Sequence, residues 1–135
     1  NKSKRLMKIG EHKQMMKLIK TIFDKVKEIH TEGQKEYAMD EDNVFANFER
    51  IGTQMDMDRE TILWVYFMKH VDGIASYLKG HKSQREDVTG RLTDAIVYLC
   101  ILWGMIQSQK EKYPGKSKHY YRRLPKGPLS KLFNV

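Results

Sequence analysis

The chain has 135 residues, of which 40% are hydrophobic and 31% charged, and its formal net charge is +8. This length suits a single domain with one core, and this composition excludes a disordered chain. The only cysteine, Cys100, excludes an intramolecular disulfide and a zinc site built on several thiolates. Its apolar neighbours Leu99 and Ile101 predict a buried, inert thiol.

The charge is divided unevenly along the chain. Residues 1–20 and 109–135 together carry fifteen Lys/Arg and two Asp/Glu, a net charge of +13, whereas residues 21–108 carry ten Lys/Arg and fifteen Asp/Glu, a net charge of −5. The folded body is therefore predicted to be acidic, with the basic charge at its ends. We expect a basic arm over 1–10, a helical domain over 11–113 and a basic extended tail over 114–135.

Apolar residues at steps of three and four predict about four helices, and hence an all-α helical bundle. The first helix is expected from Glu11 to about Gly33, a glycine that either ends the helix or only loosens it. A break near 39–43 precedes a short helix that Gly52 is expected to stop.

The second half of the domain is predicted to hold two long helices. One is expected to begin near Asp58 and to end at Gly80. Ser83 and Glu86 match a capping box, which predicts that the last helix begins there, and this helix is expected to fray near 110–113.

Neither a membrane span nor a secretory signal is predicted. The longest nearly uncharged segment, Ala95–Ser108, is shorter than the roughly twenty residues that cross a bilayer. Residues 1–20 lack the apolar region of a signal peptide. We therefore expect a cytoplasmic protein with no membrane contact. No sequence motif of a P-loop enzyme, a dinucleotide-binding domain, a zinc protease or an α/β-hydrolase occurs.

An acidic stretch is the first candidate site. Five carboxylates, Glu36 among them, lie between Glu32 and Asp42, and Asn47 and Glu49 follow shortly after. Carboxylate and amide oxygens bind hard cations such as Mg²⁺. A solvated loop with helix caps is the alternative interpretation.

Lys69, His70 and Asp72 form the second candidate site, in the middle of a strongly apolar helix. In a functional site, Lys69 would contact a phosphate and Asp72 would bind a metal. A buried, hydrogen-bonded histidine beside a local ion pair is the alternative.

The third candidate site is on the last helix, where Asp87, Arg91 and Asp94 share one side. Asp94 precedes the apolar sequence Ala-Ile-Val-Tyr-Leu, and a carboxylate that enters a core is costly unless it is paired or metal-bound. Asp94 is therefore the strongest single candidate, with a structural ion pair to Arg91 or Lys69 as the alternative.

Four stretches resemble small helical phage proteins related to the nucleotide-modification-associated and MazG-like nucleotide pyrophosphohydrolase groups. They are Lys35–Ala38, Asp42–Glu49, Tyr66–Ile74 and Glu86–Leu99. The resemblance implies a helical bundle, often a dimer, that uses helix-borne carboxylates and Mg²⁺ to hold the phosphates of a nucleotide. The chain departs from the MazG-like ExxE and ExxD pairs, because Arg91 stands three residues before Asp94 and no ExxE pair occurs.

Two hypotheses of function follow. The first is a phage Mg²⁺-dependent nucleoside triphosphate pyrophosphohydrolase in the cytoplasm of a bacterial host. Its metal ligands would be Glu36, Glu49, Asp72 and Asp94, its catalytic residues Glu36, Glu49, Lys69 and Asp94, and its nucleotide contacts Asn47, His70 and Arg91.

The second hypothesis is a non-enzymatic phage interaction protein that binds host machinery, a nucleic acid or a nucleotide signal. Its basic tail would hold phosphates and stack on bases through Lys116, Lys118, Tyr120, Tyr121, Arg122 and Arg123. A solubilising tail is the alternative interpretation of the same residues.

Overall fold

The computed structural model describes residues 8–37, 42–81 and 86–112, and this part of the chain contains four α-helices and no strand. The helices are α1 (His12–Tyr37), α2 (Ala46–Met55), α3 (Arg59–Leu78) and α4 (Val88–Lys112). The predicted all-α helical bundle is confirmed. Most of the predicted arm over 1–10, and the whole tail over 114–135, lie outside the described residues.

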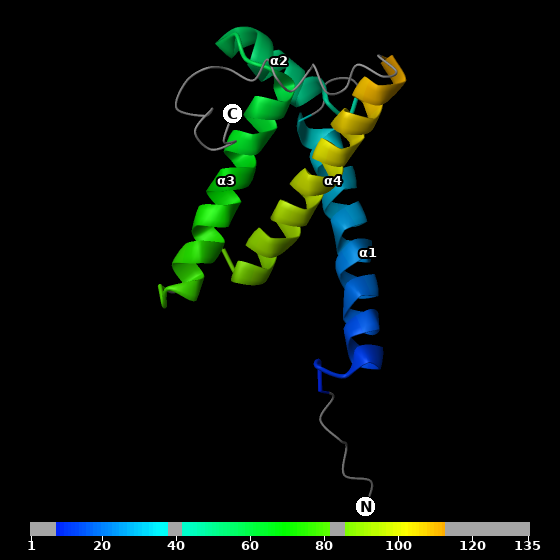
Figure 1. Cartoon of the computed structure of the whole chain (residues 1–135), viewed down its shortest axis with the longest axis vertical. Coiled ribbons are helices and arrows are strands. Elements are labelled where there is room, and N and C mark those ends of the chain that lie inside the picture. The colour runs from blue at the N-terminus through cyan, green and yellow to red at the C-terminus, as the bar shows by residue number, and fades with distance from the viewer. Residues whose placement is uncertain (1–7, 38–41, 82–85, 113–135) are drawn as a thin grey trace, which may run out of the picture.

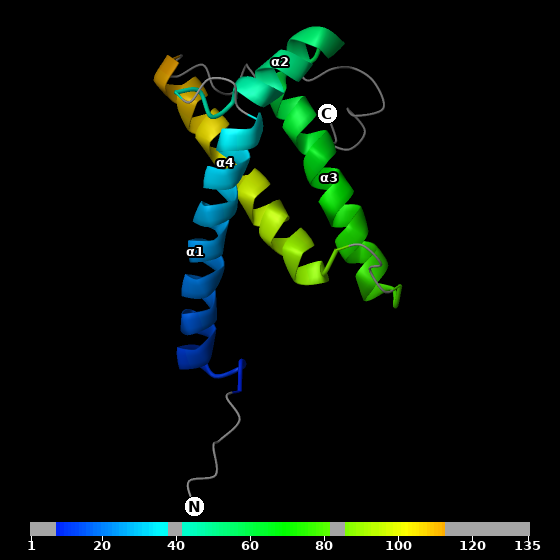
Figure 2. The ribbon, with the colours of Figure 1, turned by 180° about the vertical axis from the view of Figure 1, so that it is seen from behind.

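Helix α4 is the centre of the arrangement. It packs against α3 on one side and against α1 on the other, while α2 packs against α3. Helices α3 and α4 run in opposite directions, and the N-terminal half of α1 projects past the other helices in both views of the ribbon (Figures 1 and 2).

A small core forms where α2, α3 and α4 meet. Leu63 and Met105 are fully buried, and Phe48 and Ile62 pack with them. The ring of Phe48 makes an edge contact with Tyr66, with their centroids 6.0 Å apart. Burial of these apolar side chains is the main force that holds the three helices together.

Arg59 joins the same three helices by polar contacts. Its guanidinium donates to the carboxylates of Glu49 in α2 and Glu60 in α3, and to the backbone carbonyl of Met105 in α4. The guanidinium also lies over the ring of Phe45, 4.6 Å from the centroid. A buried arginine with this many partners fixes the angle at which the helices meet.

One predicted helix end is wrong, because α2 continues past Gly52 to Met55. Of the two alternatives for Gly33, the structure shows the second, since α1 continues past this glycine to Tyr37. Gly52 serves a close approach instead, because a Cβ there would lie 2.5 Å from the backbone oxygen of Met57. The actual turn is at Asp56, in the left-handed conformation with φ 53°.

The other helix boundaries agree with the prediction in part. α3 begins after Asp58, as predicted, and ends at Leu78, before Gly80. α4 begins at Val88, whereas the capping box predicted an earlier start; Ser83 of that box lies outside the described residues. The carbonyl of Asp87 accepts the first backbone hydrogen bonds of α4, and Glu86 precedes the helix.

Candidate functional site

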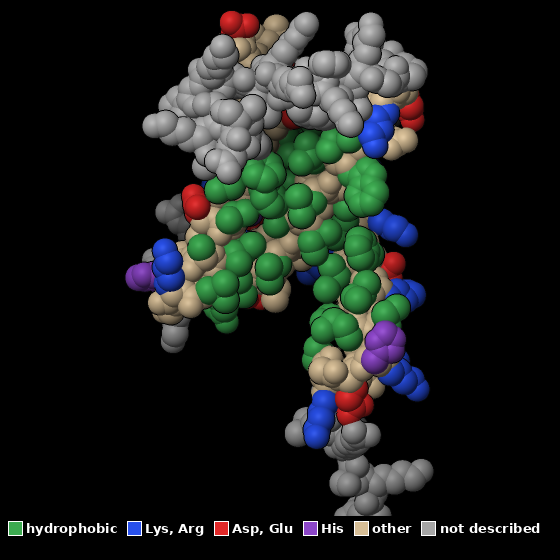
Figure 3. Space-filling view, viewed as in Figure 1, with side chains coloured by type: hydrophobic (Ala, Val, Ile, Leu, Met, Phe, Trp, Pro, Cys, Tyr) green, Lys and Arg blue, Asp and Glu red, His purple; other side chains and the backbone are tan. Residues whose placement is uncertain are grey.

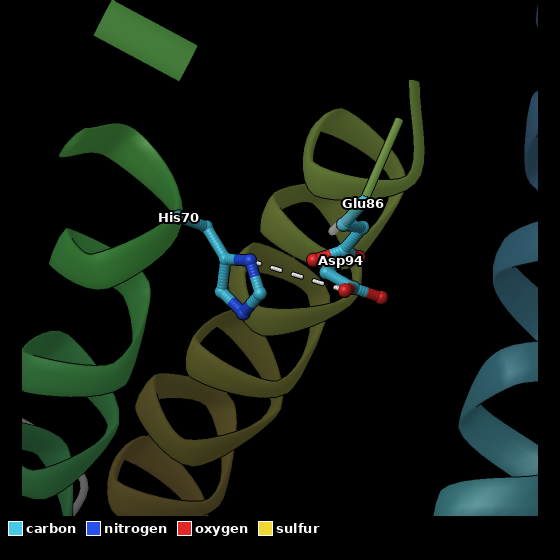
Figure 4. A group of neighbouring side chains, drawn as sticks. All are labelled: His70, Glu86 and Asp94. Atoms are coloured by element: carbon cyan, nitrogen blue, oxygen red, sulfur yellow. Dashed lines mark ion pairs between the residues drawn. The ribbon is translucent and has the colours of Figure 1, made fainter. Parts of the chain in front are cut away.

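Three side chains converge where α3 passes the beginning of α4 (Figure 4). His70 comes from α3, Asp94 from α4 and Glu86 from the segment just before α4. One ligand atom from each lies within 4.8 Å of the others. Within residues 8–37, 42–81 and 86–112, this is the one group of three or more His, Cys, Asp or Glu side chains so placed.

Helical spacing explains how the group is assembled. On α3, Tyr66, His70 and Gly73 lie four and seven residues apart, so they share one side of the helix. Gly73 leaves room for the side chain of Arg91, since a Cβ at Gly73 would overlap the guanidinium. Arg91 is three residues before Asp94, so the arginine and the carboxylate are neighbours on α4.

His70 is held between the two helices. Its ring lies 5.3 Å from that of Tyr98, and its Nδ1 is 3.9 Å from an Asp94 carboxylate oxygen. That distance is too long for a hydrogen bond. The His70 side chain is only 14% exposed, and its buried Nδ1 has no hydrogen-bond partner. Buried nitrogens of this kind normally have a partner, so a cation between Nδ1 and the carboxylates fits the residues present.

The carboxyl of Asp94 has a raised pKa. Burial raises this pKa above the ordinary value of 3.8, and a hydrogen bond with Glu86 raises it further, while His70 and Arg91 act in the opposite direction. The carboxylate of Glu86 also disfavours ionisation of Asp94, because two like charges close together repel each other. A bound cation would favour the ionised form of Asp94.

A cavity of about 270 Å³ opens on the other side of Asp94, between α1, α2 and α4. Its polar lining includes His30, Gln34, Asn47 and Asp94. Its apolar lining comprises Ile29, Val44, Phe48, Val97 and Ile101, together with the ring of Tyr98. The volume is close to the lower end of ligand pockets, roughly 300–1,000 Å³, and suits a single ring system such as a nucleobase.

The structure brings some of the sequence-predicted residues together. His70, Arg91 and Asp94 lie around the convergence of α3 and α4, and Asn47 shares the cavity with Asp94. Glu86 was missed as a ligand because the sequence assigned it to a helix cap. The proximity of Glu86 to His70 depends on how α4 is placed against α3, which no local pattern reveals.

Other predicted residues lie elsewhere. Glu36 is exposed near the end of α1, and Lys69 and Asp72 are exposed on α3. Glu49 accepts hydrogen bonds from Arg59 and from the side-chain amide of Asn43. None of these side chains belongs to the His70, Glu86 and Asp94 group. The predicted tail residues, Lys116 to Arg123, lie outside the described part of the chain.

By its fold and its site, the chain is an all-α protein with a His/Glu/Asp group where two antiparallel helices pack. Comparison with known protein families, with curated proteins and with solved structures finds no match.

Proposed function

We propose that this protein binds a divalent cation at His70, Glu86 and Asp94 and uses it to hold the phosphates of a nucleotide, as a phage nucleotide-handling protein. The observation that carries the proposal is the buried Nδ1 of His70, which lacks a hydrogen-bond partner and lies close to the carboxylates of Glu86 and Asp94. Asp94 keeps the role that the sequence suggested for it. Glu86 and His70 take the place of Glu36, Glu49 and Asp72 as ligands.

The donor set bears on the choice of cation. Mg²⁺ prefers an all-oxygen shell, whereas an imidazole together with two carboxylates suits Mn²⁺ or Zn²⁺ at least as well. The proposal therefore extends the expected Mg²⁺ to include Mn²⁺. When bound, such a cation supplies positive charge to phosphate oxygens and lowers the pKa of a coordinated water.

The remaining groups have separate roles. The guanidinium of Arg91 is beside Asp94 and offsets charge on the phosphates, as a fixed donor does in phosphoryl chemistry. The cavity beyond Asp94 receives the base, with Asn47 as a polar contact. In the enzymatic form of the proposal, water cleaves the bond between the α- and β-phosphates, giving a nucleoside monophosphate and pyrophosphate.

Cation binding is the first test. Titration of the full chain with Mn²⁺, followed by calorimetry and by the loss of the free-ion EPR signal, should give one site per chain. Asp94→Asn should weaken binding at least about tenfold, and Asp72→Asn, an exposed carboxylate on α3, is the matched control. Equal binding by both variants would show that the cation is held elsewhere.

Turnover is the second test. The protein is incubated with each common NTP and dNTP, with Mg²⁺ or Mn²⁺, and the products are separated by chromatography. A monophosphate and pyrophosphate that disappear with Asp94→Asn support the enzyme. Cation-dependent nucleotide binding without any product would instead support the second hypothesis, a non-enzymatic protein that sequesters a nucleotide signal.

A further inference from the structure

One side of α4 carries an apolar seam that the described part of the chain leaves uncovered. Its residues follow one another at steps of four, three, four and three: Leu92, Ile96, Leu99, Trp103 and Ile106. Leu92 is 44% exposed, Leu99 46% and Trp103 74%. This spacing is typical of a helix that packs lengthwise against another helix. An indole exposed to this extent along such a seam indicates a missing partner.

The projecting half of α1 also carries exposed apolar side chains at helical spacing. Met15, Ile19 and Phe23 lie four residues apart and are exposed. They belong to the N-terminal half of α1, whose first turns extend beyond α4 (Figures 1 and 2). Helices in proteins owe most of their stability to packing of an amphipathic face. This half of α1 presents such a face without a partner among the described residues.

A groove joins the two apolar faces. It has a volume of about 320 Å³ between α1 and α4, and its lining is Phe23, Val26, Lys27, His30, Val44, Val97, Cys100 and Ile101. Cys100 stands next to Leu99 and three residues before Trp103, so the groove adjoins the seam of α4. Figure 3 shows hydrophobic side chains in a continuous field over α4 and the adjoining parts of α3 and α1.

We propose that a second copy of this chain covers this face, giving a twofold dimer in which the seam of α4 and the projecting half of α1 are buried. Met15, Ile19, Phe23, Leu92, Leu99 and Trp103 expose on the order of 600 Å² of apolar surface, if a large side chain offers roughly 150–250 Å². A stable interface buries about 800 Å² per partner, of which about 65% is apolar in homodimers. The exposed area therefore matches one half of a dimer interface.

A membrane is the other occupant to consider, because α4 has the length and apolar composition of a membrane-crossing helix over Val88–Glu111. A core helix of a soluble protein has the same composition. Away from the seam, α4 carries the charged side chains of Arg91 and Asp94 and buries the polar side chains of Thr93 and Gln109. The seam is thus a stripe on a helix that also carries charged and buried polar side chains, which favours a partner helix over lipid.

The test compares oligomeric state between variants of the full chain. Light scattering and sedimentation from low to high micromolar concentration should give twice the 16.0 kDa mass for the natural sequence. Trp103→Glu and Leu99→Glu should give the monomer with unchanged helicity by circular dichroism. Val65→Glu is the matched control, because Val65 is as exposed as Leu99 but shares its side of α3 with Lys69 and Asp72. This variant should remain dimeric.

The single thiol gives an independent readout. Cys100 is exposed in the free chain, so its reaction with a thiol reagent should slow as the dimer forms and should regain speed in Trp103→Glu. A natural chain that stays monomeric at high micromolar concentration overturns the proposal. So does a dimer that persists in both seam variants, and so does a monomer whose Trp emission shifts only on vesicles of anionic phospholipid.

Discussion

The two sides of α4 differ in what covers them, although both carry apolar side chains. On the inner side, Asp94, Tyr98 and Met105 meet the other helices, and Met105 is fully buried. On the outer side, Leu99 and Trp103 remain exposed. Apolar side chains on two sides of a helix need cover on both sides, and the described part of one chain covers only one of them. The candidate site lies on the covered side, and the proposed dimer contact lies on the other.

The largest difference between the two sides should appear in stability. Leu63→Ala, at a fully buried position of the core that includes Met105, should lower the free energy of unfolding by about 2–4 kcal/mol. Leu99→Ala should cost under about 0.5 kcal/mol in the Trp103→Glu background, where the chain is expected to be monomeric. Urea denaturation measures both. Similar losses would mean that Leu99 is buried in the monomer.

Replacement of Arg59 should lower the stability nearly as much as Leu63→Ala does. Arg59→Met deletes the guanidinium that bonds Glu60, which is 5% exposed, and the variant should lose about 2–4 kcal/mol of stability because a buried charge loses a partner. Arg50→Met removes an exposed hydrogen bond to Asn47 and should change stability by under about 0.5 kcal/mol. Thermal and urea unfolding of the two variants, side by side, provide the check.

Replacement of Asp94 should have a smaller effect on stability, and this effect should depend on pH. The raised pKa of Asp94 means that the folded chain holds this proton more tightly than the unfolded chain, so stability falls as pH rises from 3.8 through the folded pKa. In EDTA at pH 7, Asp94→Asn should raise Tm by on the order of 2 °C, since the carboxylate is partly solvated.

The pH dependence supplies the control for that variant. Near pH 3 the carboxyl is protonated in both states, and Asp94→Asn should leave Tm unchanged. Scanning calorimetry at the two pH values separates this effect from a general loss of packing. A Tm that falls at pH 7 would indicate that ion pairing with His70 or Arg91 outweighs burial.

Gly73→Ala should change stability least. A Cβ at this position displaces the side chain of Arg91, and the better helix propensity of alanine, about 1 kcal/mol, offsets the adjustment. Stability should therefore change by under about 1 kcal/mol. Nucleotide affinity should fall while Mn²⁺ affinity is kept, because Arg91 is not one of the proposed ligands. Ser76→Ala, at an exposed position of α3, should change neither affinity.

Local sequence patterns located most of the helices but misplaced several of their ends. The break before α2 and the start of α3 after Asp58 follow from the periodicity of the apolar residues. Gly52 was read as a stop, yet it lies inside α2, because the glycine is needed where the chain folds back at Met57. Cys100 was predicted to be buried from its apolar neighbours and is exposed, so that prediction was wrong.

Local sequence patterns also predicted only part of the candidate site. Asp94 is evident from sequence because a carboxylate inside an apolar run is costly and needs a reason. Glu86 is not evident, because its distance from His70 depends on the crossing of α3 and α4. The cavity that holds Asn47 beside Asp94 likewise requires α1, α2 and α4 together.

The sequence by itself determined the helical class, the acidic centre and the unusual position of Asp94, a carboxylate at the start of an apolar run. These depend on period, composition and the cost of a buried charge, all of which act within a few residues. Only the tertiary structure decided which apolar side of α4 is covered, which carboxylates meet a histidine and which pair with Arg59. Such choices depend on the packing angles between helices, and these angles are set by side chains distant in the sequence.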